Sequence, residues 1–298
     1  MCSGAVAAEH SLSAGSLDRI ALLGLLITGV AVLGAPLWLM LLAPLFFGVP
    51  HVFGDIWVLF LRPSAARGLI FWLGPGLLAL LGLRVAGAFG YSAGSFWEQF
   101  AGIAVLLGGA WYGRSLGRGA GVALLALPAL IWPSEAALWL GHAHNVVAVG
   151  FLLWLVPLRQ SLPVASVFVL GMGAILSGAL DGQVPWDSAA GLGLPGMAKS
   201  LAPGLAEPWS SRLVLSFAFG QAIHYLCWVG LLPASTNFFG RSSWPTASWL
   251  LRLSLLGTVG LCAAAAADPL AVRSGYLSLV LFHGWMELGA LAAGAVRR

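Results

Sequence analysis

Five of the six histidines in this sequence lie inside apolar segments, where ionisable side chains are rare and usually functional. The sixth, His10, belongs to a polar N-terminal stretch. Because neutral imidazole is a common ligand of transition metals, the five could contribute to a shared metal site. The five histidines are His51, His142, His144, His224 and His283.

Two of these histidines are followed, four residues later, by a carboxylate. His51 precedes Asp55, and His283 precedes Glu287. Residues four apart share one face of a helix, so each pair directs an imidazole and a carboxylate to the same side. A carboxylate buried at this depth is costly unless it binds a cation or accepts a strong hydrogen bond. It could ligate the metal or orient the histidine.

The depth of the histidines suggests that they belong together. Counted from the outer end of each apolar segment, they fall within roughly 10 Å of one another along the membrane normal, at about 1.5 Å per residue. Four segments therefore bring an imidazole to a similar level. We predict one site, with His51, His144, His224 and His283 as metal ligands and with Asp55 and Glu287 as ligands or orienting groups.

The pair His142 and His144 leaves an alternative open, because residues two apart point in different directions on a helix. Asn145 and the apolar run that follows favour His144 as the residue facing the site. Gln221, three residues before His224, could orient that histidine. We expect Gln221, Asn145 and Tyr225 to surround the ligands. Asp55 could instead pair with Arg62, and Glu287 with Arg297 or Arg298.

Imidazole and carboxylate ligands suit non-haem iron, zinc or manganese. The leading hypothesis is an iron-dependent membrane oxidoreductase acting on a lipophilic substrate such as a carotenoid or a lipid. No nucleotide-binding fingerprint is found in the sequence, so electrons would come from an external donor. One alternative is a b-type cytochrome, with two histidines as axial haem ligands. Another is a proton-coupled transporter or channel that uses the histidines and carboxylates as a relay.

The elements that position these residues are expected to be transmembrane helices. Hydrophobic residues make up 60% of the 298 positions and charged residues 8%, far below the usual share of about 25% in a soluble domain. We predict a single all-α integral membrane domain over residues 1–298, a helix bundle of about ten spans. The first and fifth are short, so eight or nine spans remain an alternative. The predicted segments are 19–34, 36–62, 67–86, 95–113, 119–133, 134–157, 162–180, 211–233, 246–266 and 274–294.

The arginines predict an orientation for this bundle. With both termini on the cytoplasmic side, ten of the fourteen basic residues fall at inner ends and four at outer ends, as the positive-inside rule requires. The four outer residues are Arg84, Lys199, Arg212 and Arg273. Residues 181–211 then form an outer loop, with an interfacial helix expected near 197–205. The basic residues form no patch, which argues against a nucleic-acid partner.

The stretch Gly48-Val49-Pro50-His51 with Asp55 resembles the early motif of the Brp/Blh family of bacterial membrane β-carotene 15,15'-dioxygenases. The resemblance implies a multi-helix protein of the bacterial cytoplasmic membrane, with intramembrane histidines that hold a non-haem iron. His51 would be the first ligand, and His224, followed by Tyr225, would match the next. The family's His-x-x-x-His motif is absent; the nearest substitutes are His142 with His144, or His283 with Glu287.

Overall fold

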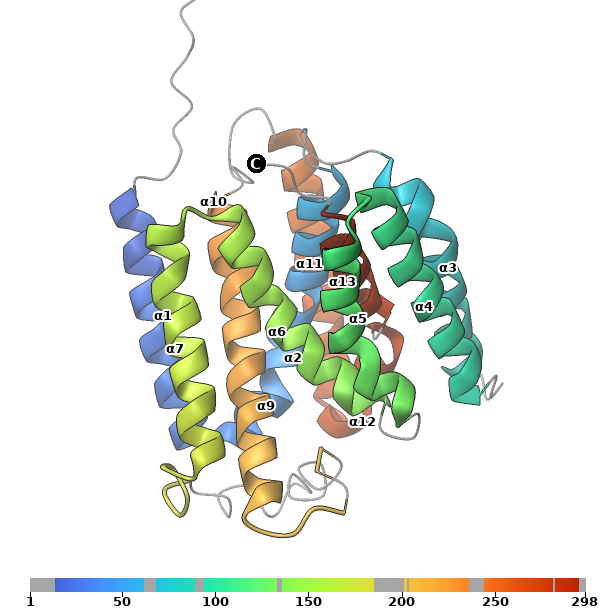
Figure 1. Cartoon of the computed structure of the whole chain (residues 1–298). Helices are drawn as coiled ribbons and strands as arrows, with labels where there is room; N and C mark the ends of the chain where they lie inside the picture. Colours follow the sequence, from blue (N-terminus) through green and yellow to red (C-terminus); the bar gives the residue numbers. More distant parts are fainter. Residues whose placement is uncertain are drawn as a thin grey trace, which may run out of the picture.

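The computed structural model describes residues 14–61, 68–88, 94–132, 136–184, 201–202, 204–235, 244–280 and 282–294. Within these ranges the regular structure is helical throughout and includes no strand, which confirms the all-α prediction. With the labels of Figure 1, the helices are α1 (Ala14–Gly34), α2 (Pro36–Ile56), η1 (Trp57–Leu61), α3 (Leu69–Ala88), α4 (Gly94–Gly113), α5 (Leu116–Ile131), α6 (Ala136–Leu155), α7 (Leu158–Ser177), α9 (Trp209–Tyr225), η4 (Leu226–Leu231), α10 (Leu232–Ser235), α11 (Trp244–Ala265), α12 (Pro269–Val280) and α13 (Phe282–Ala293).

Seven helical stretches among the described residues are long and apolar enough to cross a membrane. They are 36–61, 69–87, 138–155, 158–177, 209–235, 248–265 and 269–293. Large apolar side chains point outward from the bundle; Phe71 and Leu170, for example, are 75% and 71% exposed. Such a surface suits lipid rather than water. Each of the ten predicted segments contains a helix, but the count of ten spans stays a prediction.

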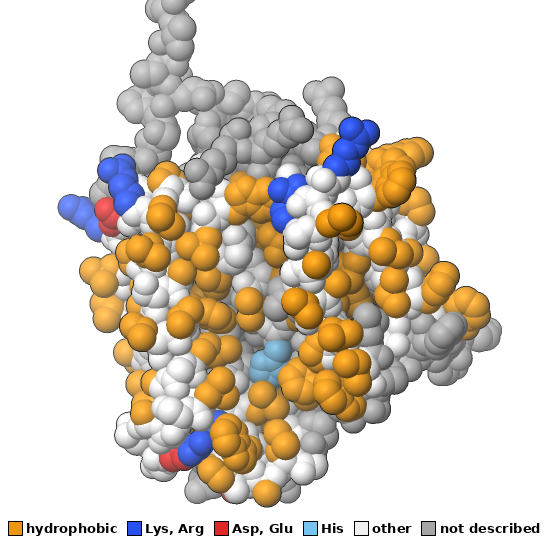
Figure 2. Space-filling model, viewed as in Figure 1, with side chains coloured by type: hydrophobic (Ala, Val, Ile, Leu, Met, Phe, Trp, Pro, Cys, Tyr) orange, Lys and Arg blue, Asp and Glu red, His pale blue; other side chains and the backbone are white. Residues whose placement is uncertain are grey.

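The outer surface has the layering expected of a membrane protein. Figure 2 shows hydrophobic side chains over the middle of the face drawn, with charged side chains near its two ends. The helices run up and down through the bundle, so that α1 begins and α13 ends at the same end of it (Figure 1). The arrangement is compatible with two termini on one side of a membrane. The N-in, C-in orientation stays a prediction.

Two helices form the interior of the bundle. In α9, every residue from Val214 to Tyr225 is buried, and the helix packs against α1, α2, α6 and α7. In α13, His283 to Ala290 are buried, and this helix packs against α3, α4, α5 and α6. Helix α2 contacts α9 on one side and α11 and α12 on the other. Polar residues on α2, α6, α9 and α13 can therefore meet inside the bundle.

Small residues allow α4 and α13 to approach closely. A methyl group added at Gly109 would overlap the backbone carbonyl of Gly289, and one added at Gly113 would overlap the carbonyl of Ala293. Small residues at a helix crossing are common in membranes, where tight packing replaces the hydrophobic driving force. The crossing fixes the position of α13 relative to the rest of the bundle.

Helical irregularities follow two of the four helices that face the interior. Helix α2 continues into the π-helical η1, and α9 continues into the π-helical η4. Pro44 and Pro50 interrupt the hydrogen bonding of α2. Because Pro44 has no N–H, the carbonyl of Met40 loses its partner within the helix, and Nε of Arg273 donates to it over 2.7 Å.

The outer loop predicted over 181–211 is described only in part. Asp181, Leu201 and residues 204–208 form turns and irregular backbone before α9, whereas most of the expected interfacial helix near 197–205 lies outside the described residues. Arg212, at the start of α9, binds Asp181 at 2.5 Å and so ties the loop to the bundle. Hydrogen bonding from Arg212 lowers the pKa of the Asp181 carboxyl.

Candidate metal centre

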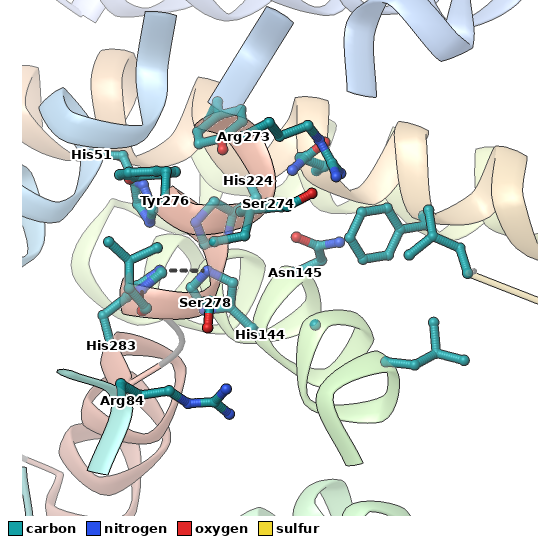
Figure 3. Close-up of a pocket in the computed structure, with 18 residues that line it drawn as sticks. His51, Arg84, His144, Asn145, His224, Arg273, Ser274, Tyr276, Ser278 and His283 are labelled. Carbon is teal, nitrogen blue, oxygen red and sulfur yellow. Dashed lines mark hydrogen bonds between the residues drawn. The ribbon is translucent and has the colours of Figure 1, made fainter. Parts of the chain in front are cut away.

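Four imidazoles from four helices meet in the interior, between α2, α6, α9 and α13 (Figure 3). One nitrogen of each can be chosen so that all four lie within 4.8 Å of one another. The ring centroids of His144 and His224 are 4.0 Å apart, and those of His51 and His283 are 4.7 Å apart. The structure thus brings together His51, His144, His224 and His283.

Two of the rings are held through Nδ1 by backbone carbonyls on their own chain segment. His51 Nδ1 lies 3.0 Å from the carbonyl of Gly48, and His283 Nδ1 contacts the carbonyl of Val280. A carbonyl that accepts from Nδ1–H fixes the tautomer and leaves Nε2 with a free lone pair. Both residues therefore present Nε2 to the centre of the cluster.

The spacing of two nitrogens suits a shared metal ion. Nε2 of His144 and Nε2 of His283 are 3.0 Å apart, a distance that also allows an N–H···N hydrogen bond when one ring carries the proton there. Two imidazole ligands, each about 2.0–2.1 Å from one ion, lie about 2.9–3.4 Å apart for bond angles between 90° and 109°. Neither ring nitrogen of His224 makes a hydrogen bond to the described residues.

The two carboxylates lie against the same imidazoles. Oδ2 of Asp55 is 3.7 Å from Nε2 of His51, and Oε2 of Glu287 is 2.8 Å from Nδ1 of His144. Glu287 therefore contacts a histidine of another helix, whereas the sequence pairs it with His283 of its own helix. Such a carboxylate can hold the ring of His144 with its Nε2 toward the other histidines.

No lysine or arginine in the described part of the chain neutralises either carboxylate. The side chains of Asp55 and Glu287 are fully buried, and they contact each other and the histidines. The arginines proposed as partners, Arg62, Arg297 and Arg298, lie outside the described residues. Buried carboxylates without a cationic partner are costly, and a bound cation would remove that cost.

The donors form two overlapping sets that share one residue. The first set is the four histidines; the second is His51 with Asp55 and Glu287, whose ligand atoms also lie within 4.8 Å of one another. Either set could hold a metal ion. Nitrogen and oxygen donors in this combination suit iron, zinc or manganese.

His142 lies apart from the cluster, although it was a candidate ligand. Its ring packs edge-on against Phe217, with the centroids 5.2 Å apart, and lies 6.5 Å from the ring of Trp139. It points away because residues two apart on a regular helix diverge by about 200°. The structure places His144, and not His142, among the four.

The three residues expected around the ligands line a cavity of about 380 Å³ next to the histidines. Gln221 and Asn145 are buried, and each has one side-chain atom without a hydrogen bond to the described residues. The ring of Tyr225 lies 5.3 Å from that of His51. The volume is within the usual range of about 300–1,000 Å³ for small-molecule sites.

Several cavity residues were not foreseen as part of the site. They are Arg84, Arg273, Ser274, Tyr276 and Ser278. The sequence places Arg273 at the outer flank of the last span, which it predicts to begin at residue 274, but the helix α12 begins at Pro269. An arginine within an otherwise apolar stretch was the signal that could have identified it.

Comparison of the chain with protein-family models, with curated proteins and with solved structures finds no similar protein. The resemblance to the Brp/Blh family around His51 therefore remains a prediction from the sequence.

Proposed function

We propose that the protein is a membrane-embedded metalloenzyme, with iron as its metal, that oxidises a lipophilic substrate. One observation carries the proposal: four imidazoles and two fully buried carboxylates, which no lysine or arginine of the described residues neutralises, converge beside a cavity inside an apolar bundle. Isolated structural histidines would have no reason to share one centre with two carboxylates. A cation at this centre would satisfy both donor sets.

The donors favour iron, zinc or manganese over copper(I), and iron is the one of these that most readily supports oxidation. Copper(I) prefers thiolate or thioether ligands, and no cysteine of the described residues belongs to either donor set. A bound iron would supply redox chemistry, while His51 and His283, held by backbone carbonyls, keep their Nε2 atoms in place. The electrons would come from an external donor, because the sequence has no nucleotide-binding fingerprint.

The surroundings of the cavity support a lipophilic substrate. Leu138, Leu201, Phe217 and Leu277 line it together with the polar residues. The bundle around it exposes apolar side chains, so a carotenoid or a lipid could approach from the bilayer rather than from water. An apolar cavity with a few fixed polar groups is typical of such sites.

A haem is less compatible with this geometry. The flat haem ring must lie between two opposed axial imidazoles. Here the ring of His51 is 4.7 Å from both His224 and His283, so that imidazoles fill the space a porphyrin would need. A proton relay would use the same side chains, but it gives no reason for four nitrogens to face one point.

The proposal is tested by the metal content of the purified protein after expression in metal-replete medium. We expect about one equivalent of iron or more per chain for the wild type. The variants His144→Ala, His224→Ala and His283→Ala should each lose at least half of it. His142→Ala is the matched control, because it removes an intramembrane histidine outside the cluster, and it should retain the wild-type content.

A wild-type protein with less than about a tenth of an equivalent of any transition metal would contradict the proposal. Equal losses in His142→Ala and in the cluster variants would show that the effect is structural. An absorption spectrum of the same sample tests the haem alternative, since a Soret band would replace the non-haem assignment by a cytochrome.

A further inference from the structure

The cavity beside the histidines contains a buried cation for which the described residues provide no counter-ion. Arg273 is only 6% exposed, and it lines the cavity from α12 (Figure 3). Its Nε donates to the carbonyl of Met40, but within the described residues no carboxylate lies within ion-pair distance and neither terminal nitrogen donates a hydrogen bond to the protein. A guanidinium buried without an anion is costly.

Two other arginines near the same end of the bundle show the ordinary arrangement. Arg84, which also lines the cavity, pairs with Glu98, and Arg212 pairs with Asp181. Arg273 is buried more deeply than either, yet it is the unpaired one of the three. Its charge is therefore available to a molecule that enters the cavity.

The contact with Met40 positions this charge. Because Pro44 frees the Met40 carbonyl, the Nε–H of Arg273 is held there at 2.7 Å, and the two terminal nitrogens remain as a fork. A guanidinium fork binds a carboxylate through two parallel hydrogen bonds. Hydroxyl groups of Ser274 and Tyr276 line the same cavity, and that of Tyr276 has no hydrogen-bond partner among the described residues.

The balance of charge in the cavity favours a ligand with one negative charge. Asp55 and Glu287 would offset a divalent ion at the histidines, and Glu98 already offsets Arg84. One positive charge, that of Arg273, is left. A phosphate monoester carries close to two negative charges at neutral pH, whereas a carboxylate carries one.

We propose that the cavity binds an amphipathic lipid carboxylate, whose head group pairs with Arg273 and whose apolar chain lies against the histidine cluster. The assignment names the substrate class of the metal centre, and so it rests on the function proposed above. Recognition of the head group at one end of the cavity would place a particular carbon of the chain at the histidines, which is how a binding group directs the position of reaction.

The test is a binding experiment with the full chain in nanodiscs of phosphatidylcholine. A spin-labelled stearate serves as the probe, because the immobilised fraction of its spectrum reports binding to protein. Unlabelled dodecanoate, dodecanol and dodecyl phosphate compete for it. For the wild type we expect dodecanoate to compete at least about 10-fold better than dodecanol, as charge-assisted hydrogen bonds allow.

Arg273→Gln should abolish this preference, lowering the affinity for dodecanoate by about 10- to 100-fold while dodecanol is unaffected. Arg273→Lys keeps the positive charge but lacks the two terminal nitrogens of the fork. Its affinity for dodecanoate should therefore lie between that of the wild type and that of Arg273→Gln. Arg252→Gln is the control, since Arg252 is exposed on α11 outside the cavity.

Equal competition by dodecanoate and dodecanol in the wild type would overturn the inference without any variant. An unchanged preference in Arg273→Gln would overturn the role of this residue. Stronger competition by dodecyl phosphate would assign the site to a phosphate. Metal content measured on the same samples separates the two proposals: metal without carboxylate preference refutes only this inference, whereas a wild type without metal refutes the proposed function.

Discussion

At the scale of single residues, the contact between Glu287 and His144 connects α13, an interior helix, with its neighbour α6. A carboxylate that contacts the Nδ1 of a metal-binding histidine raises its basicity and fixes its ring. The same carboxylate is fully buried, and no lysine or arginine of the described residues pairs with it. A bound metal ion would offset the cost of its burial.

Glu287→Gln should therefore weaken metal binding while it stabilises the metal-free protein. Metal affinity is expected to fall by about 10- to 100-fold. The metal-free form should become more stable, because a buried carboxyl group that no lysine or arginine of the described residues neutralises is removed. Thermal unfolding with and without added iron measures both effects: the Tm without iron should rise, and the further increase on adding iron should be smaller than in the wild type.

Glu207→Gln, at an exposed position before α9, is the control. An equal iron-induced rise in Tm in the wild type and in Glu287→Gln would refute the role of Glu287.

The sequence indicates which residues meet at the site, but not which histidine each carboxylate contacts. Depth along the chain places His51, His224 and His283 at one level, because a helix rises by a constant amount per residue. The direction in which each side chain points depends on helix rotation and tilt, which a single sequence does not contain. For this reason Glu287 is paired with His283 on the basis of spacing, but in the structure it contacts His144.

At the scale of helices, the crossing of α4 and α13 determines where half of the site lies. Helix α13 carries both His283 and Glu287, and its Gly289 lies against Gly109 of α4. The overlap that a side chain would cause is with backbone, which has little freedom to move aside.

Gly109→Ala should consequently destabilise the protein by about 1–3 kcal/mol, as overpacking does, and lower the metal content. Gly74→Ala in α3 is the matched control. A methyl group there meets nothing within 4 Å, so the change should be neutral or stabilise the helix by up to about 1 kcal/mol. Thermal unfolding in detergent distinguishes the two. Metal retention by Gly109→Ala together with an unchanged Tm would contradict the importance of the crossing.

The interruption of α2 at Pro44 leads to a second prediction about an element. Pro44→Ala restores the N–H that pairs with the Met40 carbonyl, so Arg273 loses its anchor. Helix α2 should be at least as stable as before, whereas the affinity for dodecanoate in the competition assay should fall several-fold. Pro75→Ala, in α3 outside the cavity, provides the comparison. The same loss in both variants would show that the anchor has no specific effect.

The helices themselves could be predicted well, and their ends less well. Long apolar runs separated by Pro, Gly and Arg indicate each of the ten segments. Helix ends depend on contacts elsewhere in the fold, as the start of α12 at Pro269 shows: its Arg273 is held by a carbonyl of α2. A boundary placed a few residues late was enough to exclude Arg273 from the site.

For the whole molecule, the distribution of arginines predicts that the N-terminus and the C-terminus both lie on the cytoplasmic side of the membrane. Fusions test this in a bacterial host: green fluorescent protein at the C-terminus should fluoresce, and alkaline phosphatase inserted into the loop 181–211 should be active. In the control the two reporters are exchanged: alkaline phosphatase at the C-terminus should be inactive, and green fluorescent protein in the loop should not fluoresce. A fluorescent insertion in the loop, or an active phosphatase at the C-terminus, would reverse the orientation.

The residues of the site are spread along the chain, and this determines when the site can assemble during synthesis. His51 belongs to the second helix, whereas His283 and Glu287 belong to the last helix described. A nascent chain inserted as far as α11 holds three of the imidazoles and Asp55, and it lacks the remaining donors of both sets. Binding of the proposed metal would therefore follow the insertion of α13, and a chain whose synthesis stops earlier would lack a complete donor set.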